Sequence, residues 1–280
     1  MRTQADKIYL QLLHAVRHYG DEVSTRNSDV YTHWNLPNVT FTEFPLITLR
    51  KTAAMKAIRE MEWFLSGKTE CPEELLDWWK GQLCEEGMLL DGYSMQFRNF
   101  TKYESSEVGE IGFFDQVEFI LNALKTNPNS RRLVMTVWNP GEMANITETN
   151  QNPNTPTCCH SIVVQFFVRQ GKLHMKTYQR SADMLLGVPH NWVQSWAMLM
   201  YFAAQSGLEV GSMTWMWGDA HIYKEESHLE VVEKLLKYEG TFDKSIELVY
   251  SQTSEDFLAG DFGIIGVTPE PLVTTRPKLL

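Results

Sequence analysis

The chain has 280 residues, of which 43% are hydrophobic and 12% aromatic, and its formal net charge is −10. The hydrophobic and aromatic content is that of a folded protein with a sizeable core and excludes a disordered chain. The negative net charge argues against a general nucleic-acid-binding surface. The N-terminus lacks the uninterrupted apolar run of a signal peptide and no segment approaches about 18 apolar residues, so no membrane association is expected.

Apolar periodicity and turn residues predict the elements in chain order. Helices are expected at residues 6–19, 51–66, 115–125, 192–205 and 225–237, and strands at 30–32, 39–41, 133–138, 162–168, 172–178, 212–217 and 246–250. Arg169-Gln170-Gly171 is expected to turn a hairpin, and the polar residues 139–157 to form a loop. Because the elements mix without a strict βαβ rhythm, we expect an α+β fold.

The cysteines indicate a reducing compartment. Cys71, Cys84, Cys158 and Cys159 lack the paired spacing of a zinc site, and adjacent cysteines rarely bridge each other. A reduced, cytoplasmic protein without a bound metal is therefore expected.

A polar motif spans a predicted strand-to-helix junction. Tyr178-Gln179-Arg180-Ser181-Ala182-Asp183 is followed closely by Gly187-Val188-Pro189-His190-Asn191. An arginine is a good bidentate partner for a phosphate, and an asparagine can both donate to and accept from the edge of a nucleobase. The motif therefore suggests a nucleotide pocket, although an ordinary strand end with a surface arginine explains its first half as well.

Two further residues carry chemistry that such a pocket could use. Cys159 follows Cys158 just before a predicted strand. If its thiolate is partly accessible and near positive charge, it is a strong nucleophile; if the thiol is buried, it is only a small hydrophobic side chain. Glu60 lies on a helical face with Ala57 and Phe64. Burial on such a face disfavours a charged carboxylate and suits it to proton transfer, whereas a partly exposed glutamate would be structural.

These motifs, together with Gly218-Asp219-Ala220-His221-Ile222-Tyr223, resemble the thymidylate synthase and pyrimidine-nucleotide hydroxymethylase superfamily over nearly the whole chain. The resemblance implies one domain over residues 1–280, a mixed β-sheet packed with helices, and a homodimer formed through the sheet. It also implies dUMP as substrate, 5,10-methylenetetrahydrofolate as co-substrate, no metal, and a C-terminal tail, residues 263–280, that closes over the active site.

The resemblance assigns roles to individual residues. The catalytic set is Cys159, Glu60, Tyr93 and Asn191; the substrate-binding set is Arg26, Arg131, Arg132, Gln179, Arg180, Ser181, Asp183, Asn191, His221 and Tyr223; and the folate-binding set is Trp79, Asp183, Leu186, Gly187 and His190. Arg131 and Arg132 would reach across the dimer interface. Asn191 would read uracil, where cytosine-acting relatives have an aspartate. The thiol lies one residue farther from Gln165 than in the family, which a one-residue bulge would reconcile and which leaves Cys158 as an alternative nucleophile.

Three outcomes stay open. A synthase takes hydride from the folate and releases dTMP, whereas a dUMP 5-hydroxymethylase admits water and releases 5-hydroxymethyl-dUMP with tetrahydrofolate. The length of the tail and Trp79 favour the synthase; Glu62, an altered folate side and a loop without glycines around Arg26 favour the hydroxymethylase and are typical of a phage-encoded enzyme, which would act in the host cytoplasm. The third outcome is a nucleotide-binding paralogue without catalysis, against which Cys159, Glu60 and Tyr93 argue together.

Overall fold

The structure is a computed structural model that describes residues 1–25, 28–90, 92–103, 111–140, 158–275 and 277. Its helices are α1 (Gln4–Tyr19), α2 (Ala54–Ser66), α3 (Leu76–Trp79), α4 (Tyr93–Arg98), α5 (Gln116–Thr126), α7 (Val188–Gln205) and α8 (Glu226–Leu236), with short 3-10 helices η1 (Glu73–Leu75) and η2 (Ala259–Asp261). Its strands are β1 (Asp21–Ser24), β2 (Asp29–His33), β3 (Val39–Phe41), β4 (Phe100–Tyr103), β5 (Ile111–Phe114), β6 (Val134–Thr136), β7 (Val163–Arg169), β8 (Lys172–Asp183), β9 (Glu209–Tyr223), β10 (Glu247–Tyr250) and β11 (Phe262–Ile265).

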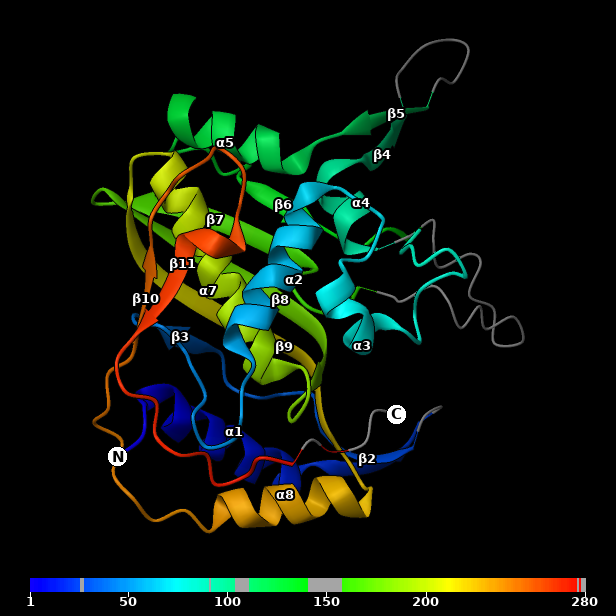
Figure 1. The fold of residues 1–280 in the computed structure, drawn as a ribbon, viewed down its shortest axis with the longest axis vertical. Coiled ribbons are helices and arrows are strands. Elements are labelled where there is room, and N and C mark those ends of the chain that lie inside the picture. Colours follow the sequence, from blue (N-terminus) through cyan, green and yellow to red (C-terminus); the bar gives the residue numbers. More distant parts are fainter. Residues whose placement is uncertain (26–27, 91, 104–110, 141–157, 276, 278–280) are drawn as a thin grey trace.

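A mixed seven-stranded sheet is the centre of the fold (Figure 1). Its order is β1-β2-β9-β8-β7-β6, and β3 pairs with another part of β9. The β7–β8 hairpin turns through Gln170 and Gly171, whose φ angles of 53° and 76° suit a tight two-residue turn. The mixed sheet packed with helices confirms the predicted α+β class.

The parallel pairing of β8 with β9 brings two distant motifs together. Ser181 lies opposite Asp219 in the register, and Asp183 opposite His221. The carbonyl of His221 also accepts a hydrogen bond from Met184 N at 3.0 Å. The end of the first polar motif therefore lies beside the second, although about 40 residues separate them.

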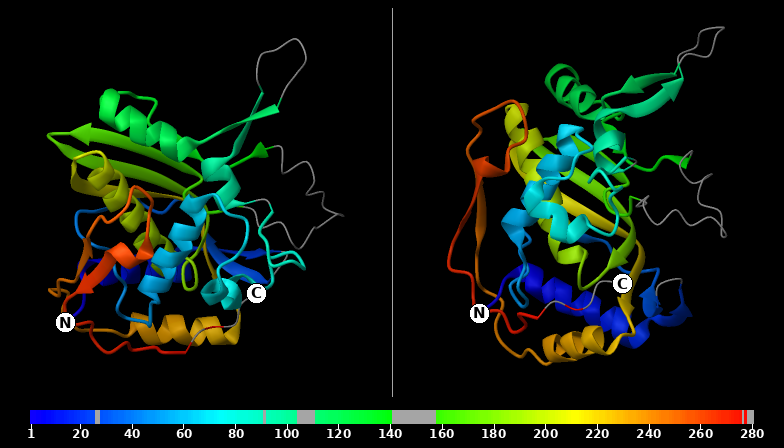
Figure 2. Two further views of the ribbon diagram at one scale, coloured as in Figure 1. Left: turned by 45° about the horizontal axis from the view of Figure 1, so that its top comes forward. Right: turned by 45° about the vertical axis from the view of Figure 1, so that its right-hand side comes forward.

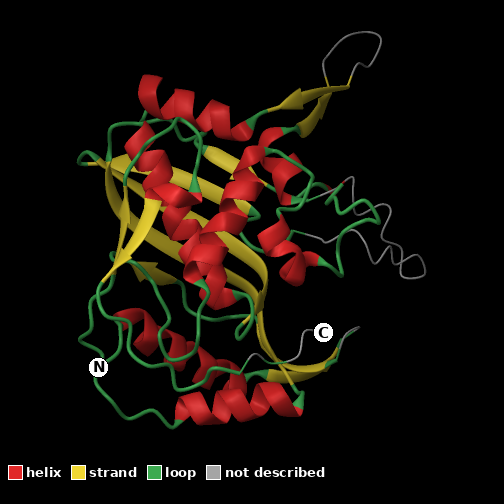
Figure 3. Cartoon of the chain, in the orientation of Figure 1, coloured by secondary structure: helices red, strands yellow, loops and turns green. Residues whose placement is uncertain are grey.

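Helices α2 and α7 lie over one face of the sheet, whereas α1 and α8 lie at its lower end (Figures 2 and 3). Most of α7 is buried because it packs against both α2 and the sheet. Helix α2 is amphipathic and buries Ile58, Met61 and Phe64, and it ends at Gly67, whose φ of 75° is the left-handed conformation that glycine adopts without strain. The polar residue that α2 buries is Glu60.

A buried carboxylate ties the first helix to the segment that leads into α2. Asp6 accepts hydrogen bonds from the backbone amides of Thr48 at 2.7 Å and Leu49 at 3.0 Å, and it forms a capping box with Thr3. The C-terminal segment joins the same place, since Leu272 N donates to Leu49 O at 2.8 Å. The tail thus lies alongside the approach to α2, while its closure over the site stays a prediction.

Most predicted elements are confirmed, with three informative differences. Helix α7 begins at Val188 rather than at residue 192, because a proline is compatible with the first helical turn. Strand β9 runs through Gly218 to Tyr223, whereas the expected strand ends at residue 217, so the second polar motif is part of the strand. The described part of residues 68–114, for which no element is expected from the sequence, contains the short helices η1, α3 and α4 and the strand pair β4–β5. No helix among the described residues is long and apolar enough to cross a bilayer, and the cytoplasmic location stays a prediction.

Candidate active site

The predicted thiol is the better exposed of the two adjacent cysteines. Cys158 is 3% exposed and belongs to the core, whereas Cys159 is half-buried. The Cys159 carbonyl accepts a hydrogen bond from Arg180 N at 2.8 Å, so β8 fixes the position of the segment. Cys159 therefore has the access that a nucleophile needs, and Cys158 does not.

The backbone between the cysteines and Gln165 is irregular just before the strand. The regular β7–β8 ladder begins at Val163, which lies opposite Tyr178. Immediately before it, Ser161 has a φ of 51°, in the left-handed region that residues with a side chain seldom adopt. The irregular backbone therefore lies ahead of β7, and the extra residue relative to the family stays a prediction.

Tyr93 holds the cysteine segment from the other side. Its hydroxyl accepts hydrogen bonds from Cys159 N at 2.9 Å and His160 N at 3.4 Å, and lies 3.4 Å from Cys159 Sγ. The ring stacks on Phe64 of α2 with centroids 4.4 Å apart. The residue thus joins α2, the start of α4 and the thiol.

The electrostatics of the pair favour a neutral tyrosine that donates to sulfur. Burial raises the pKa of the Tyr93 hydroxyl well above its ordinary value, so it keeps its proton. Burial also raises the pKa of the Cys159 thiol, and the hydrogen bond from Tyr93 and the positive charge of Arg180 oppose that rise. The Cys159 thiolate therefore depends on these two neighbours and on a backbone hydrogen bond from His160.

His160 is not an acid–base group at neutral pH. It is buried, and its Nδ1 lies 3.3 Å from Ser161 Oγ, which in turn lies 3.2 Å from Ser195 Oγ. Burial lowers the pKa of its imidazole from 6.5 to about 3. A neutral ring in a closed hydrogen-bonded chain has a structural role beside the thiol.

Glu60 is 8% exposed and both of its carboxylate oxygens accept hydrogen bonds. The indole Nε1 of Trp79 donates to Oε1, and the amide Nε2 of Gln194 donates to Oε2. Helices α2, α3 and α7 each contribute one member of this group. A buried carboxylate held by two donors can take part in proton transfer if water or substrate reaches it.

A chain of side-chain amides leads away from that carboxylate. Asn191 Nδ2 donates to Gln194 Oε1 at 3.1 Å, and Asn191 Oδ1 accepts from Gln179 Nε2 at 3.0 Å. Gln179 Nε2 also donates to Ser181 O at 3.0 Å. The structure thus brings Glu60, Asn191 and Gln179 together, as the sequence predicts for one site.

Arg180 is arranged for an anionic partner. Its guanidinium lies over the ring of Trp138, 5.1 Å from the centroid, and its buried Nε has no hydrogen-bond partner among the described residues. An unsatisfied buried donor on a cation is costly unless an anion such as a phosphate occupies it. Ser181 follows it on β8.

The other predicted phosphate ligands are not in this cluster. Arg131 and Arg132 are exposed in the turn before β6, where Arg132 N donates to Ser130 Oγ at 3.1 Å and Arg131 O accepts from Gln165 Nε2 at 3.4 Å. Neither guanidinium has an ion pair within the parts of the chain that are described. Arg26 lies outside the described residues.

Three predicted substrate-binding residues share the β8–β9 edge, and one of them, Asp183, is also in the predicted folate-binding set. His221 and Tyr223 have ring centroids 5.1 Å apart. Asp183, opposite His221 in the register, accepts from Leu185 N at 2.8 Å and Leu186 N at 3.0 Å with one oxygen. Its carboxylate shapes the turn into α7 and presents this edge to a ligand.

The predicted folate wall differs in part from expectation. Trp79 is turned inward, because its N–H binds Glu60 and its ring packs edge-on against Trp63 at 5.3 Å. His190 is held by Leu186 O at 2.8 Å, and its ring lies 5.0 Å from that of Trp78. A Cβ on Gly187 would lie 3.2 Å from Asn191 Oδ1, so any larger residue here would press on the Asn191 amide. The aromatic wall therefore includes Trp78, which sequence reasoning missed.

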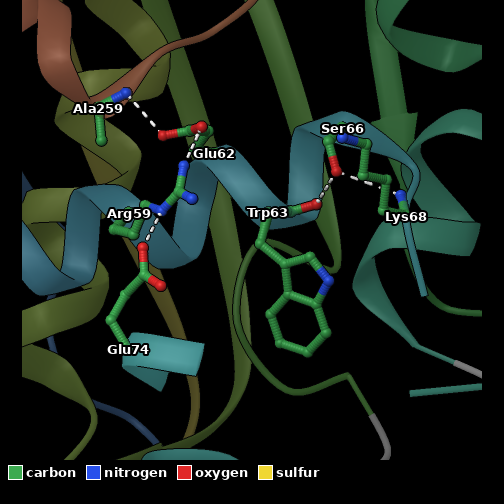
Figure 4. A network of polar contacts seen from close by, with 7 residues as sticks. All are labelled: Arg59, Glu62, Trp63, Ser66, Lys68, Glu74 and Ala259. Carbon is green, nitrogen blue, oxygen red and sulfur yellow. Dashed lines mark hydrogen bonds and ion pairs between the residues drawn. The ribbon is translucent and has the colours of Figure 1, made fainter. Parts of the chain in front are cut away.

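Glu62 points away from Glu60 and holds the C-terminal region. Its Oε2 accepts from Ala259 N at 2.8 Å, and it forms an ion pair with Arg59, whose Nε lies 2.5 Å from Glu74 Oε1 (Figure 4). In Figure 4, Ala259 and the ring of Trp63 lie on opposite sides of α2. Glu62 is thus a fixed anchor for η2, the segment before the tail.

Sequence reasoning also missed Gln194 and Trp138. Gln194 follows Asn191 by three residues, a spacing at which helical side chains meet, so its contact with Asn191 could have been predicted once α7 was extended to Val188. The stacking of Trp138 on Arg180 had no local signal.

Comparison with known proteins gives a consistent result. A family model described as thymidylate synthase matches residues 7–278. A thymidylate synthase of Corynebacterium aurimucosum is 34% identical over 236 residues, which cover 83% of this chain and 82% of that protein. The similarity therefore includes the cysteine segment, both polar motifs and Glu60.

Replacement of Tyr93 by phenylalanine tests the support of the thiolate. Without the hydroxyl, we expect the apparent pKa of Cys159 to rise by about one unit, the effect of one hydrogen bond to a charged group. The rate of alkylation by iodoacetamide, followed at Cys159 by mass spectrometry across pH, measures it. Tyr201→Phe removes a hydroxyl that bonds Glu255 O and is the matched control. An unchanged pH profile in Tyr93→Phe would contradict the assignment.

The buried neutral His160 predicts a loss of stability in acid. Its folded pKa lies below the unfolded value, so its contribution is complete above about pH 6.5 and is lost as the pH falls toward 3. Across this window the free energy of unfolding of the wild type should fall by about 1.4 kcal/mol per pH unit more than that of His160→Gln, as measured by urea unfolding. His14→Gln, at an exposed position, should follow the wild type. Parallel pH dependences of the wild type and His160→Gln would refute the neutral buried state.

Proposed function

The chain belongs to the thymidylate synthase family and is a one-carbon methyltransferase, and from that premise we propose that it converts dUMP and 5,10-methylenetetrahydrofolate into dTMP and dihydrofolate. The observation that carries the proposal is the placement of a partly exposed thiol, Cys159, against a neutral tyrosine hydroxyl and beside the arginine that has an unsatisfied donor. In such surroundings the arginine can bind and orient an anionic substrate, and the tyrosine hydroxyl can stabilise the thiolate by donating a hydrogen bond to it.

In the proposed reaction the Cys159 thiolate adds to C6 of the uracil ring. The electron pair of the C5–C6 double bond moves toward C5 and O4, which makes C5 an enolate-like nucleophile. Arg180 would bind the phosphate, and Asn191 would pair with the N3 and O4 edge of the base. Because Arg180 N also bonds Cys159 O at 2.8 Å, the phosphate ligand and the nucleophile share one rigid attachment.

Glu60 is the proposed proton carrier. C5 must lose its proton after it has bound the methylene carbon, and the charge on O4 rises and falls during the reaction. The carboxylate is buried and linked through Gln194 to the base-reading Asn191, which supports a position close to the O4 side of the ring. Proton movement through ordered water would connect the two.

The residues present fit a folate on the α2–α7 side. Asp183 supplies a polar group, and the rings of Trp78 and His190 supply an aromatic wall. The absence of a side chain at Gly187 leaves room beside Asn191. The co-substrate supplies the methylene group and then a hydride. Loss of the C5 proton expels the folate nitrogen from the methylene carbon and leaves an exocyclic methylene. Hydride then adds to that methylene, the C6–S bond breaks to release Cys159, and the C5–C6 double bond forms again. The chain's task is to exclude water while the hydride moves.

One argument for the hydroxymethylase outcome is weakened by the contacts of Glu62. A residue that delivers water to the exocyclic methylene would have to face the site. Glu62 instead binds Ala259 N and Arg59, and so holds the segment before the tail. This arrangement supports tail closure, and with it the synthase reaction, over addition of water.

We further propose a homodimer through the uncovered sheet face, with Arg131 and Arg132 donated to the partner's phosphate site. On β7, β8 and β9 many alternate side chains are buried, and some of the less buried ones line a hollow. This hollow includes Phe167, His174, Lys176 and Thr214. A partly apolar sheet face suits a self-complementary two-fold interface, and it leaves the exposed arginine pair free for the partner.

Product mass distinguishes the two reactions. After incubation with dUMP and 5,10-methylenetetrahydrofolate, we expect a nucleotide heavier by about 14 Da and stoichiometric dihydrofolate, followed by absorbance near 340 nm, because a shielded intermediate is reduced rather than hydrated. A gain of about 30 Da without dihydrofolate would establish the hydroxymethylase instead. No product would leave a nucleotide-binding paralogue.

Paired cysteine variants serve as controls in the same assay. Cys159→Ala should bind dUMP and yield no product, whereas Cys158→Ala should keep turnover, since its thiol is buried. The reverse result would assign the nucleophile to Cys158.

Mixed subunits test the shared site. Cys159→Ala and the double variant R131A/R132A should each be inactive, or nearly so, as homodimers. A two-fold dimer that exchanges arginines restores one complete site per heterodimer, so an equal mixture refolded together should recover about a quarter of wild-type activity. If mass spectrometry shows that heterodimers have formed and the mixture still has no activity, donation of the arginines across the interface would be contradicted.

A further inference from the structure

Four polar side chains form a continuous hydrogen-bonded chain beneath the proposed base site. It runs from Glu60 through Gln194 and Asn191 to Gln179. Gln194 is fully buried at 0% exposure, and Gln179 is nearly so. Gln194 has no role in the reaction proposed above, yet it is the member that joins the proton carrier to the base reader.

The direction of every amide in this chain is determined by its two ends. Glu60 accepts from Trp79 Nε1 with one oxygen and from Gln194 Nε2 with the other, so Gln194 turns its NH₂ toward Glu60 and its oxygen toward Asn191. At the other end, the Ser181 carbonyl can only accept, so Gln179 turns its NH₂ toward Ser181 and Asn191. Both ends place the Asn191 nitrogen on the Gln194 side.

Asn191 keeps one donor and one acceptor for a ligand. One of its two N–H groups is used by Gln194, and one of the two lone pairs of Oδ1 is used by Gln179. The remaining pair matches a pyrimidine edge that donates at N3 and accepts at O4, as uracil does. Cytosine accepts at N3 and donates at its exocyclic amine, so it requires the same amide turned by 180°.

We infer that Gln194 is a specificity-determining positioning residue, which fixes the orientation of the Asn191 amide so that the site selects a uracil over a cytosine edge. The inference rests on the proposed function only in that the base binds at Asn191. An asparagine alone can bind either base by rotating its terminal amide, so the residue type does not by itself determine the choice. The hydrogen bond from Asn191 Nδ2 to Gln194 Oε1 opposes that rotation, because the turned amide would set two oxygens against each other.

The test is equilibrium binding of dUMP and dCMP without folate, measured by calorimetry on the full-length protein. The wild type should prefer dUMP. Gln194→Met keeps the volume and removes both hydrogen bonds, so the preference for dUMP over dCMP should narrow by about tenfold, the value of one hydrogen bond. If Gln194 had only a packing role, its substitution would weaken the binding of dUMP and dCMP to the same extent.

Two further substitutions at Gln194 make the test independent of folding. Gln194→Asn leaves a shorter amide that cannot span both partners, and it should narrow the preference if the methionine variant does not fold. Gln194→Glu keeps an oxygen toward Asn191 and, by sharing a proton with Glu60, a donor toward that carboxylate, so it should retain the preference. Gln205→Met, on the same helix and bonded to Ser254 O at 2.8 Å, is the matched control and should behave as wild type.

The outcomes separate the two levels of the argument. If the wild type binds neither nucleotide, the proposed function fails. If the wild type prefers dUMP and the folded methionine or asparagine variant keeps the same ratio, the proposed function stands and the role of Gln194 is overturned. Loss of the preference in Gln194→Glu as well would also overturn it, since that variant retains the oxygen that holds Asn191.

Discussion

One buried carboxylate constrains the polar interior of this protein. Glu60 lies in the contact between α2 and α7, where an unpaired charge would cost several kcal/mol. Its two donors come from α3 and α7, so three helices must keep their relative positions for the charge to be satisfied. The contact of α2 with α7 is otherwise largely apolar, so the requirement for donors at Glu60 adds a directional constraint to it.

A second constraint is the parallel pairing of β8 with β9. Parallel neighbours require a long connection, and here α7 provides it by crossing the sheet between the two strands. The turn into α7 must therefore lie directly after Asp183, beside His221. A single crossover thus brings together the first polar motif, the helix that bears Asn191 and the second polar motif. A shift of the β8–β9 register by one residue would turn alternate side chains to the opposite face of the sheet.

The parts of the site that sequence could predict are those with local patterns. The polar motif on β8, the apolar face around Glu60 and the thiol before β7 each follow from residues within a few positions of one another. Gln194 could not be found in this way, because its contact with Glu60 joins residues 134 apart and depends on how α2 crosses α7. The two adjacent tryptophans of α3 illustrate the same limit: the family resemblance places Trp79 on the folate side, but only packing shows that Trp79 turns inward and Trp78 faces His190.

Fold prediction failed where local rules gave equal support to two structures. Gly187 and Pro189 are typical of a turn, yet proline is equally compatible with the first turn of a helix, and α7 begins there. Gly218 in β9 is typical of a break in a strand. A Cβ at that position would lie 2.4 Å from Arg180 O, so the glycine is needed for close approach to β8 and the strand continues through it.

The surroundings of the thiol explain why a neutral hydroxyl is needed next to it. Arg180 is the charged group that lowers the pKa of Cys159, but a bound phosphate would neutralise much of that charge when the nucleophile is required. His160 cannot replace it, because burial lowers its pKa to about 3 and leaves the ring neutral. Tyr93, which keeps its proton because burial raises its pKa, donates to sulfur whether or not the phosphate is bound. The stacking of Tyr93 on Phe64 of α2 then makes the helix that carries Glu60 also the support of the thiolate, so the proposed nucleophile and the proposed proton carrier are held by one element.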